Sequence, residues 1–157
     1  YTLWHTLSLH DALPICYGNN AEMFRLLGLK KKKRFVEYKG MKIGFKGLLP
    51  KALKAEEFAE RVCSALECDV RLLECGTEKM REIGVCSGGS GFAARGVDCL
   101  VTGEFNHSDF HGAVEAGVNV AEAGHYNTET LGVKALGRAI KKKFKVDTVF
   151  LDAPTGL

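Results

Sequence analysis

The residues with the clearest potential for chemistry are His125 and Glu129, which lie four positions apart at the start of an expected helix. At that spacing both side chains lie on one face of the helix and can point at one ion. Imidazole nitrogen and carboxylate oxygen are suitable ligands for zinc, iron, manganese or nickel. The pair therefore predicts half of a metal site. The simpler alternative is a hydrogen-bonded histidine beside a glutamate that stabilises the positive end of the helix.

A second polar segment contains Glu104, His107 and His111 and follows another short apolar run. Loops that leave the carboxyl ends of neighbouring strands meet at one edge of an α/β sheet, so we expect Glu104 to share a pocket with His125. Glu104 and His107 are candidate catalytic residues that would transfer protons. Glu104 could instead hydrogen-bond a metal-bound histidine or cap the next helix. His107 and His111 are also compatible with further metal ligands, substrate contacts or a polar surface.

Apolar periodicity predicts the elements that must position these side chains. The expected helices are residues 21–27, 52–66, 92–95, 108–116 and 128–145. The expected strands are two within 35–45 and one each at 70–73, 82–86, 98–102, 118–122 and 146–151. Strands that alternate with helices over short loops predict an α/β protein with a mostly parallel sheet and flanking helices.

The composition is that of one globular domain, with 157 residues of which 46% are hydrophobic and 26% charged. The net charge of +3 is small and comes from local lysine runs, at 30–34 and 141–143, which argues against a nucleic-acid partner on composition alone. We expect residues 30–34 to form a solvated connector, with contact to polyphosphate or RNA as the alternative. No apolar run is long enough to span a membrane.

Six cysteines are irregularly spaced and include no C-x-x-C pair, so a structural zinc ribbon is not expected. They are typical of reduced, buried thiols in a cytoplasmic protein.

The segment Ser87-Gly88-Gly89-Ser90-Gly91 is rich in glycine and follows an expected strand. It matches neither common nucleotide-binding glycine pattern. It predicts either a cradle of backbone N–H groups for an anion or a structural tight turn.

The first fifteen residues have a separate origin. Residues 6–15, Thr-Leu-Ser-Leu-His-Asp-Ala-Leu-Pro-Ile, match the in-frame translation of a sequencing adapter. We therefore assign no function to residues 1–15 and expect the natural sequence to begin near Cys16, with its upstream part missing. We expect the rest to divide into a truncated N-terminal remnant with a connector at 16–50 and an α/β C-terminal domain at 51–157.

Five short motifs occur in one order: Gly18-Asn19-Asn20-Ala21, Val85-Cys86-Ser87-Gly88-Gly89, Thr102-Gly103-Glu104, Glu122-Ala123-Gly124-His125-Tyr126 with Thr128-Glu129, and Pro154-Thr155-Gly156-Leu157. Together they resemble the NGG-one-interacting factor three (Nif-three-like) family of dinuclear metal-centre proteins, some members of which are called type 2 GTP cyclohydrolase I. The resemblance begins near Gly18 and corresponds to the C-terminal part of a two-part α/β fold.

The resemblance implies a cytoplasmic protein that assembles as a toroidal hexamer and holds two divalent metal ions in a cleft between two similar α/β parts. His125 and Glu129 match two of the family's metal ligands. The others are a His-His pair followed by Pro and an Asp just before the Gly-Asn-Asn-Ala motif. This chain has no His-His-Pro, and Asp11 lies in the adapter-like segment, one residue out of register.

The function implied by the resemblance is metal-dependent hydrolysis of a purine nucleotide, with GTP as the suspected substrate. A bound cation would activate water for attack on the ring carbon that is lost as formate. Because only two of the usual ligands are recognised, we expect weak metal binding and impaired activity. The alternatives are a non-catalytic metal-binding scaffold or regulatory interaction protein, and a binder of nucleotides or nucleic acid without chemistry.

Overall fold

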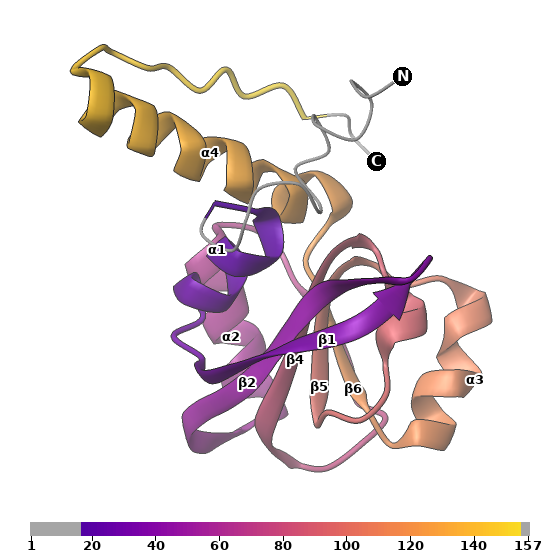
Figure 1. Ribbon diagram of the computed structural model, residues 1–157. Coiled ribbons are helices and arrows are strands. Elements are labelled where there is room, and N and C mark those ends of the chain that lie inside the picture. Colours follow the sequence, from indigo (N-terminus) through magenta and orange to yellow (C-terminus); the bar gives the residue numbers. More distant parts are fainter. Residues whose placement is uncertain (1–16, 155–157) are drawn as a thin grey trace.

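A computed structural model describes residues 17–154, in which one six-stranded sheet is flanked by helices (Figure 1). In chain order the elements are α1 (Asn19–Leu26), β1 (Lys30–Tyr38), β2 (Met41–Lys54), α2 (Ala55–Leu66), β3 (Arg71–Leu73), β4 (Lys79–Gly89), the 3-10 helix η1 (Gly91–Ala93), β5 (Cys99–Glu104), α3 (His107–Ala116), β6 (Asn119–Glu122) and α4 (His125–Phe144). The adapter-like segment 1–15 and the end of the last family motif lie outside the described residues.

The sheet is mixed, with strand order β1-β2-β4-β5-β6-β3. Its centre is parallel, because β5 pairs in parallel with both β4 and β6. The pairs β1–β2, β2–β4 and β3–β6 are antiparallel. As a result, β1, β4, β5 and β6 run in one direction and β2 and β3 in the other. The α/β class with a mostly, though not wholly, parallel sheet is confirmed.

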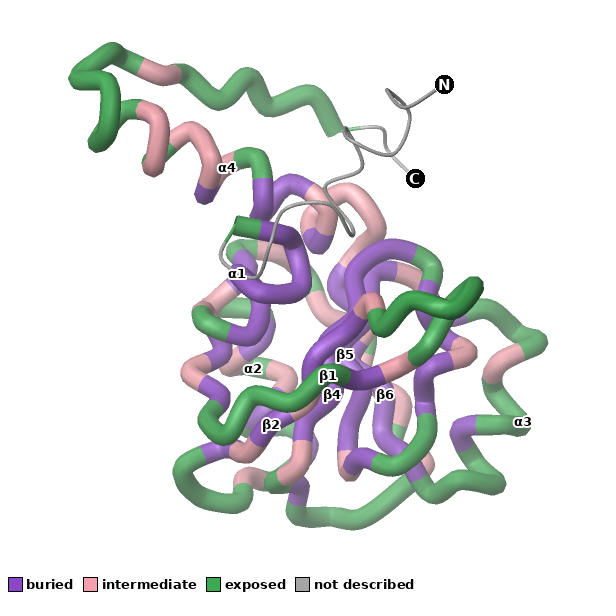
Figure 2. Tube along the Cα trace, viewed as in Figure 1, coloured by how far each residue is buried: buried purple, intermediate pink, exposed green. Residues whose placement is uncertain are grey.

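Helices cover both faces of the sheet (Figure 1). Residues of α1, α2 and the first half of α4 form one core with the sheet, and residues of η1 and α3 form a second core on the opposite face. Side chains of β5 alternate between the two faces of the sheet, so β5 contributes to both cores. Cys99 and Val101 belong to the first core and Leu100 to the second. Burial is deepest along the central strands (Figure 2).

Residues 30–38 and 41–50 are part of this sheet. Residue 50, where we expected a boundary, lies inside β2, which is hydrogen-bonded to β1 on one side and β4 on the other. We expected the lysine run 30–34 to be a connector, but it forms the exposed half of β1. β1 is an edge strand, and lysines on an edge discourage pairing with other chains.

Residues 145–154 do not form the strand that we expected at 146–151. The place beside β6 is taken by β3, and the tail instead runs back along α4 (Figure 1). Lys141 pairs with Asp147 at 3.0 Å, and the Thr148 hydroxyl donates to the carbonyl of Gly137 at 3.3 Å. Val149 and Leu151 are each 82% exposed, so their apolar alternation buries nothing here.

Among the helices of residues 17–154, none combines the length and apolar character that crossing a membrane would require.

Candidate metal and ligand site

The site lies where the parallel strands β4, β5 and β6 reach their carboxyl ends, the edge at which α/β proteins commonly bind ligands. Glu104 is the last residue of β5, and His125 is the first residue of α4, which follows β6 after two residues. We expected α4 to begin at Thr128, but it begins three residues earlier, after Gly124. His125 and Glu129 therefore share the first two turns of one helix.

His125 lies between two carboxylates. Its Nδ1 atom is 2.7 Å from Oε1 of Glu104, and its Nε2 atom is 3.1 Å from Oε1 of Glu129. All three side chains are partly exposed, by 28–43%. Each can therefore be reached from solvent while its position is held by the elements beneath it.

A neutral imidazole has one N–H and one lone pair, so it can donate a hydrogen bond to only one of these carboxylates. An imidazolium would donate to both carboxylates, whereas a neutral ring that donates from Nδ1 to Glu104 leaves the Nε2 lone pair beside Glu129. A carboxylate that accepts from Nδ1–H is the contact that metal-bound histidines usually make. The geometry is therefore compatible with a metal-binding pair, His125 and Glu129, and with Glu104 as the group that orients the ring.

The donors fit a divalent metal ion in type and spacing. Ligand atoms about 2.0–2.2 Å from one cation lie roughly 3.0–3.5 Å from each other, which matches the separation of Nε2 in His125 and Oε1 in Glu129. Their number is insufficient, because residues 17–154 contain no group of three or more His, Cys, Asp or Glu side chains placed to hold a metal. A complete shell would need ligands from beyond these residues.

Gly103 makes the approach of β5 to α4 possible. A Cβ atom at this position would lie 2.6 Å from Oγ1 of Thr128, 2.9 Å from Cα of His125 and 3.0 Å from the nitrogen of Gly88. No side chain fits there without displacing backbone. The Thr-Gly-Glu motif therefore serves to bring Glu104 within reach of His125.

Asn19 and Asn20, in the first turn of α1, hold α4 and β4 in place beside the site. Asn19 Oδ1 accepts the backbone N–H of Gly132 in α4 at 2.7 Å, and Asn20 Oδ1 accepts that of Ser87 at 2.6 Å. Asn20 also donates to the carbonyl of Ile43 in β2 at 2.8 Å. The helix that we expected at 21–27 begins at Asn19, with Gly18 as its N-cap, so both asparagines lie in its first turn. No local pattern indicated these contacts, since their partners lie 67 and 113 residues away.

The glycine-rich segment is a structural turn, because its backbone donors already have partners. The N–H of Gly88 donates to Thr128 Oγ1 at 3.2 Å, and that of Ser90 donates to the Gly88 carbonyl at 3.0 Å. With the N–H of Ser87 bound to Asn20, three of the donors that an anion cradle would need are occupied.

A cleft of about 510 Å³ opens beside the His125–Glu129 pair. It is lined by Asn20, Tyr38, Ile43, Cys86, Ser87, Gly89, Ser90, Phe92, His125 and Glu129. His107 is not among these residues. It is exposed on the first turn of α3, where its ring centroid lies 6.3 Å from that of His111.

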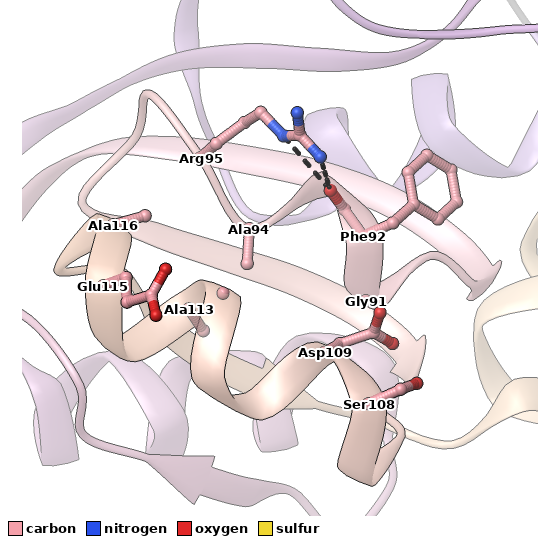
Figure 3. Close-up of a pocket in the computed structure, with 10 residues that line it drawn as sticks. Gly91, Phe92, Ala94, Arg95, Ser108, Asp109, Ala113, Glu115 and Ala116 are labelled. Carbon is pink, nitrogen blue, oxygen red and sulfur yellow. Dashed lines mark hydrogen bonds between the residues drawn. The ribbon is translucent and has the colours of Figure 1, made fainter.

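A second cavity, of about 430 Å³, lies between η1 and α3 (Figure 3). Its charged side chains are Arg95, Asp109 and Glu115, and no histidine or cysteine lines it. The Arg95 guanidinium is engaged with the carbonyl of Phe92, at 2.8 and 3.3 Å. This cavity lacks the ligands of a transition metal, so the cleft at His125 is the better candidate site.

These features define an α/β protein with a histidine–carboxylate site at the carboxyl ends of parallel strands. A family model described as Duf34/NIF3 (NGG1p interacting factor 3) matches residues 5–155. The chain belongs to this family, which confirms the resemblance seen in the sequence.

Relatives of known sequence carry the name GTP cyclohydrolase 1 type 2 homolog. One from Pyrococcus horikoshii is 45% identical over 148 residues, covering 89% of this chain and 58% of the relative. One from Archaeoglobus fulgidus is 39% identical, covering 100% of this chain and 66% of the relative. The chain thus spans less than two thirds of the length of these relatives.

Solved structures agree with the fold. The protein ybgI, described as of unknown function, superposes with a TM-score of 0.80 at 30% identity, over 93% of this chain and 59% of its own. TTHA1606 from Thermus thermophilus gives a TM-score of 0.73 at 34% identity, over 95% of this chain and 59% of its own.

Proposed function

We propose that the chain is part of a metal-dependent hydrolase that acts on a purine nucleotide, with GTP as the substrate. The observation that carries this proposal is the placement of His125 between Glu104 and Glu129. The name shared by the relatives, GTP cyclohydrolase 1 type 2 homolog, supports the choice of reaction and substrate.

In this proposal His125 Nε2 and the Glu129 carboxylate hold a divalent ion such as zinc, iron, manganese or nickel, and further ligands and a second ion come from outside the described residues. Glu104 accepts the Nδ1 proton of His125 and so fixes both the tautomer and the plane of the ring. The ion, when bound, supplies a Lewis acid that makes water a nucleophile near neutral pH.

The remaining chemistry would be carried out by side chains at or beside the cleft. Water adds to the ring carbon and one C–N bond breaks, then a second water cleaves the other C–N bond and releases that carbon as formate. Each addition releases a proton, and each departing nitrogen takes one up. Glu104 does not line the cleft, but it contacts His125, which does, and its second carboxylate oxygen can accept and return this proton. His107 remains a candidate only if the start of α3 approaches the substrate, since it does not line the cleft.

We also propose a cellular location and an assembly for the protein. Cys63, Cys68, Cys75 and Cys99 are free thiols, which supports a reducing, cytoplasmic location. In a closed homo-oligomer, the hexamer implied by the family resemblance, the missing ligands or a second half of the cleft would come from segments outside residues 17–154 or from a neighbouring copy.

The test is formate release from GTP with added Zn²⁺ or Mn²⁺, or with iron or nickel, measured for this chain and for the full-length Pyrococcus horikoshii relative. We expect turnover in the relative, its loss when the position matching His125 is changed to Ala, and no loss when the position matching His111 is changed. No formate from the full-length protein with any of the four metals would contradict hydrolysis of GTP. Metal binding without turnover would then favour the scaffold alternative.

A further inference from the structure

Two chemically different groups of side chains line the cleft. His125 and Glu129 are polar, while Tyr38, Phe92 and Ile43 are aromatic or aliphatic. The cleft volume of about 510 Å³ is within the range of sites for small organic ligands. A ligand that fills the cleft would therefore meet both polar and apolar side chains.

Two of the apolar side chains that line the cleft, Tyr38 and Phe92, are aromatic and lie close together. The rings of Tyr38 and Phe92 have centroids 5.7 Å apart and planes inclined by 35°. Tyr38 comes from the tip of the β1–β2 hairpin and Phe92 from η1, so two segments far apart in the sequence supply the pair. Figure 3 shows the Phe92 ring turned away from Ser108 and Asp109 of the second cavity. Tyr38 remains 48% exposed, with Lys39 Nζ 5.2 Å from its ring centroid, so a planar ligand could contact the exposed part of the ring.

The lining of the cleft also includes a residue whose side-chain hydroxyl has no partner among the described residues. The Ser87 hydroxyl is buried, and no hydrogen-bond partner for it exists among residues 17–154. Every other buried side-chain nitrogen or oxygen in this part of the chain has one. Rotation about the Cα–Cβ bond can turn a serine hydroxyl from one staggered position to another, and toward the cleft that Ser87 lines.

We propose that the part of the cleft lined by Tyr38 and Phe92 binds the purine ring of the substrate. Tyr38 and Phe92 contact the faces or edge of the ring, and the Ser87 hydroxyl bonds a nitrogen or oxygen at its polar edge. The ring then extends toward His125 and Glu129, where the proposed reaction occurs. The identity of the ring rests on the proposed function, whereas the shape and chemistry of the cleft do not.

Binding of guanosine, which carries the ring without phosphates, tests this assignment by titration calorimetry on the chain itself. We expect Tyr38→Ala to weaken binding about tenfold or more, because base–aromatic stacking is lost. Tyr38→Phe keeps the ring and should bind as the wild type does. Ser87→Ala should weaken binding about fivefold. Its melting temperature should not fall, because the hydroxyl removed has no partner among the described residues.

Matched controls come from α3, where Phe110→Ala and Ser108→Ala change aromatic and serine side chains outside this cleft and should leave guanosine binding unchanged. Guanosine that fails to bind the wild type, or that binds the Tyr38→Ala and Ser87→Ala variants as tightly, would overturn the assignment. Formate release by the full-length Pyrococcus horikoshii relative separates the two proposals, since guanosine binding that depends on Tyr38, together with a relative that releases no formate, supports the ring site and contradicts the metal-dependent hydrolase. Bound metal and turnover, together with guanosine binding that does not depend on Tyr38, would support the hydrolase and contradict the ring site.

Discussion

Nδ1 of His125 lies 2.7 Å from Oε1 of Glu104, a contact that joins the end of β5 to the start of α4 across 21 residues. The two nitrogens of His125 therefore have different neighbours. Nδ1 contacts Glu104, and Nε2 faces Glu129. Glu104 is thus in contact with a proposed metal ligand. Its first role in the proposed site is to position His125.

A graded series at Glu104 tests that role. Glu104→Ala removes the acceptor for Nδ1–H and should weaken zinc binding by about 10- to 100-fold. Glu104→Gln retains an acceptor oxygen without the charge and should fall between Ala and the wild type. Zinc affinity is measured by competition with a chromogenic chelator, and Glu115→Ala on α3 is the control. Equal affinity in all four proteins would show that Glu104 does not position the ligand.

The tight approach at Gly103 predicts opposite effects for two glycine exchanges. Gly103→Ala places a Cβ against Thr128 and backbone and should lower the free energy of unfolding by about 1–3 kcal/mol. Gly112→Ala in α3 meets nothing within 4 Å and should raise it by about 0.5–1 kcal/mol through helix propensity. Urea unfolding measures both values. A Gly103→Ala protein as stable as the wild type would contradict the close contact between β5 and α4.

Glu22 predicts a pH dependence of stability. The hydrogen bond from Arg25, with help from the charges of Arg25 and Arg138, lowers the pKa of this buried carboxyl against the opposing effect of burial. A lowered pKa means that the folded state favours the carboxylate. Its contribution is therefore complete above the ordinary pKa near 4.5 and is lost as the pH falls through the lowered value.

We expect Glu22→Gln to reduce the free energy of unfolding at pH 7 by about 1–3 kcal/mol. The difference from the wild type should shrink as the pH is lowered below 4.5. Denaturant unfolding at several pH values measures this difference, with the exposed Glu115→Gln as the control. A difference that stays constant down to about pH 3 would mean that the carboxylate of Glu22 is not stabilised by its arginines.

Thiol reactivity should follow exposure. Cys63 is exposed, whereas burial, with smaller effects of Cys63 and Asp69, raises the pKa of Cys68 to about 11. At pH 8 only about a thousandth of Cys68 is then thiolate, so iodoacetamide should modify it far more slowly than Cys63. Rates in the Cys63→Ser and Cys68→Ser variants, read by mass spectrometry, separate the two thiols. Modification of Cys68 at the rate of Cys63 would contradict its burial.

Local pattern predicted much of this fold and the centre of the site. The apolar runs of β5 and β6, and the i, i+4 spacing on α4, were sufficient to place Glu104 near His125. The contacts of Asn19 and Asn20 were not predictable, because an asparagine that bonds a distant backbone looks like any helix cap. The Tyr38–Phe92 pair was missed for the same reason, since neither residue has a local pattern that indicates the other.

The errors also have physical causes. Residues 146–151 alternate like a strand, but β3 occupies the place beside β6, and the tail makes its contacts with α4 instead, through Lys141–Asp147 and Thr148–Gly137. The lysine run at 30–34 was expected to be a connector because of its charge, yet an edge strand accepts charged side chains on its solvent side.

The most direct test of the proposed site is the metal content of the purified protein by elemental analysis. The full-length Pyrococcus horikoshii relative, in its wild-type form and with the His125→Ala/Glu129→Ala or His111→Ala changes at the matching positions, would be incubated with Zn²⁺ and freed of excess ion by gel filtration. We expect bound metal in the wild type and in His111→Ala, and its loss in the double variant. Equal metal in all three proteins, or none in the wild type, would contradict the assignment of His125 and Glu129 as ligands.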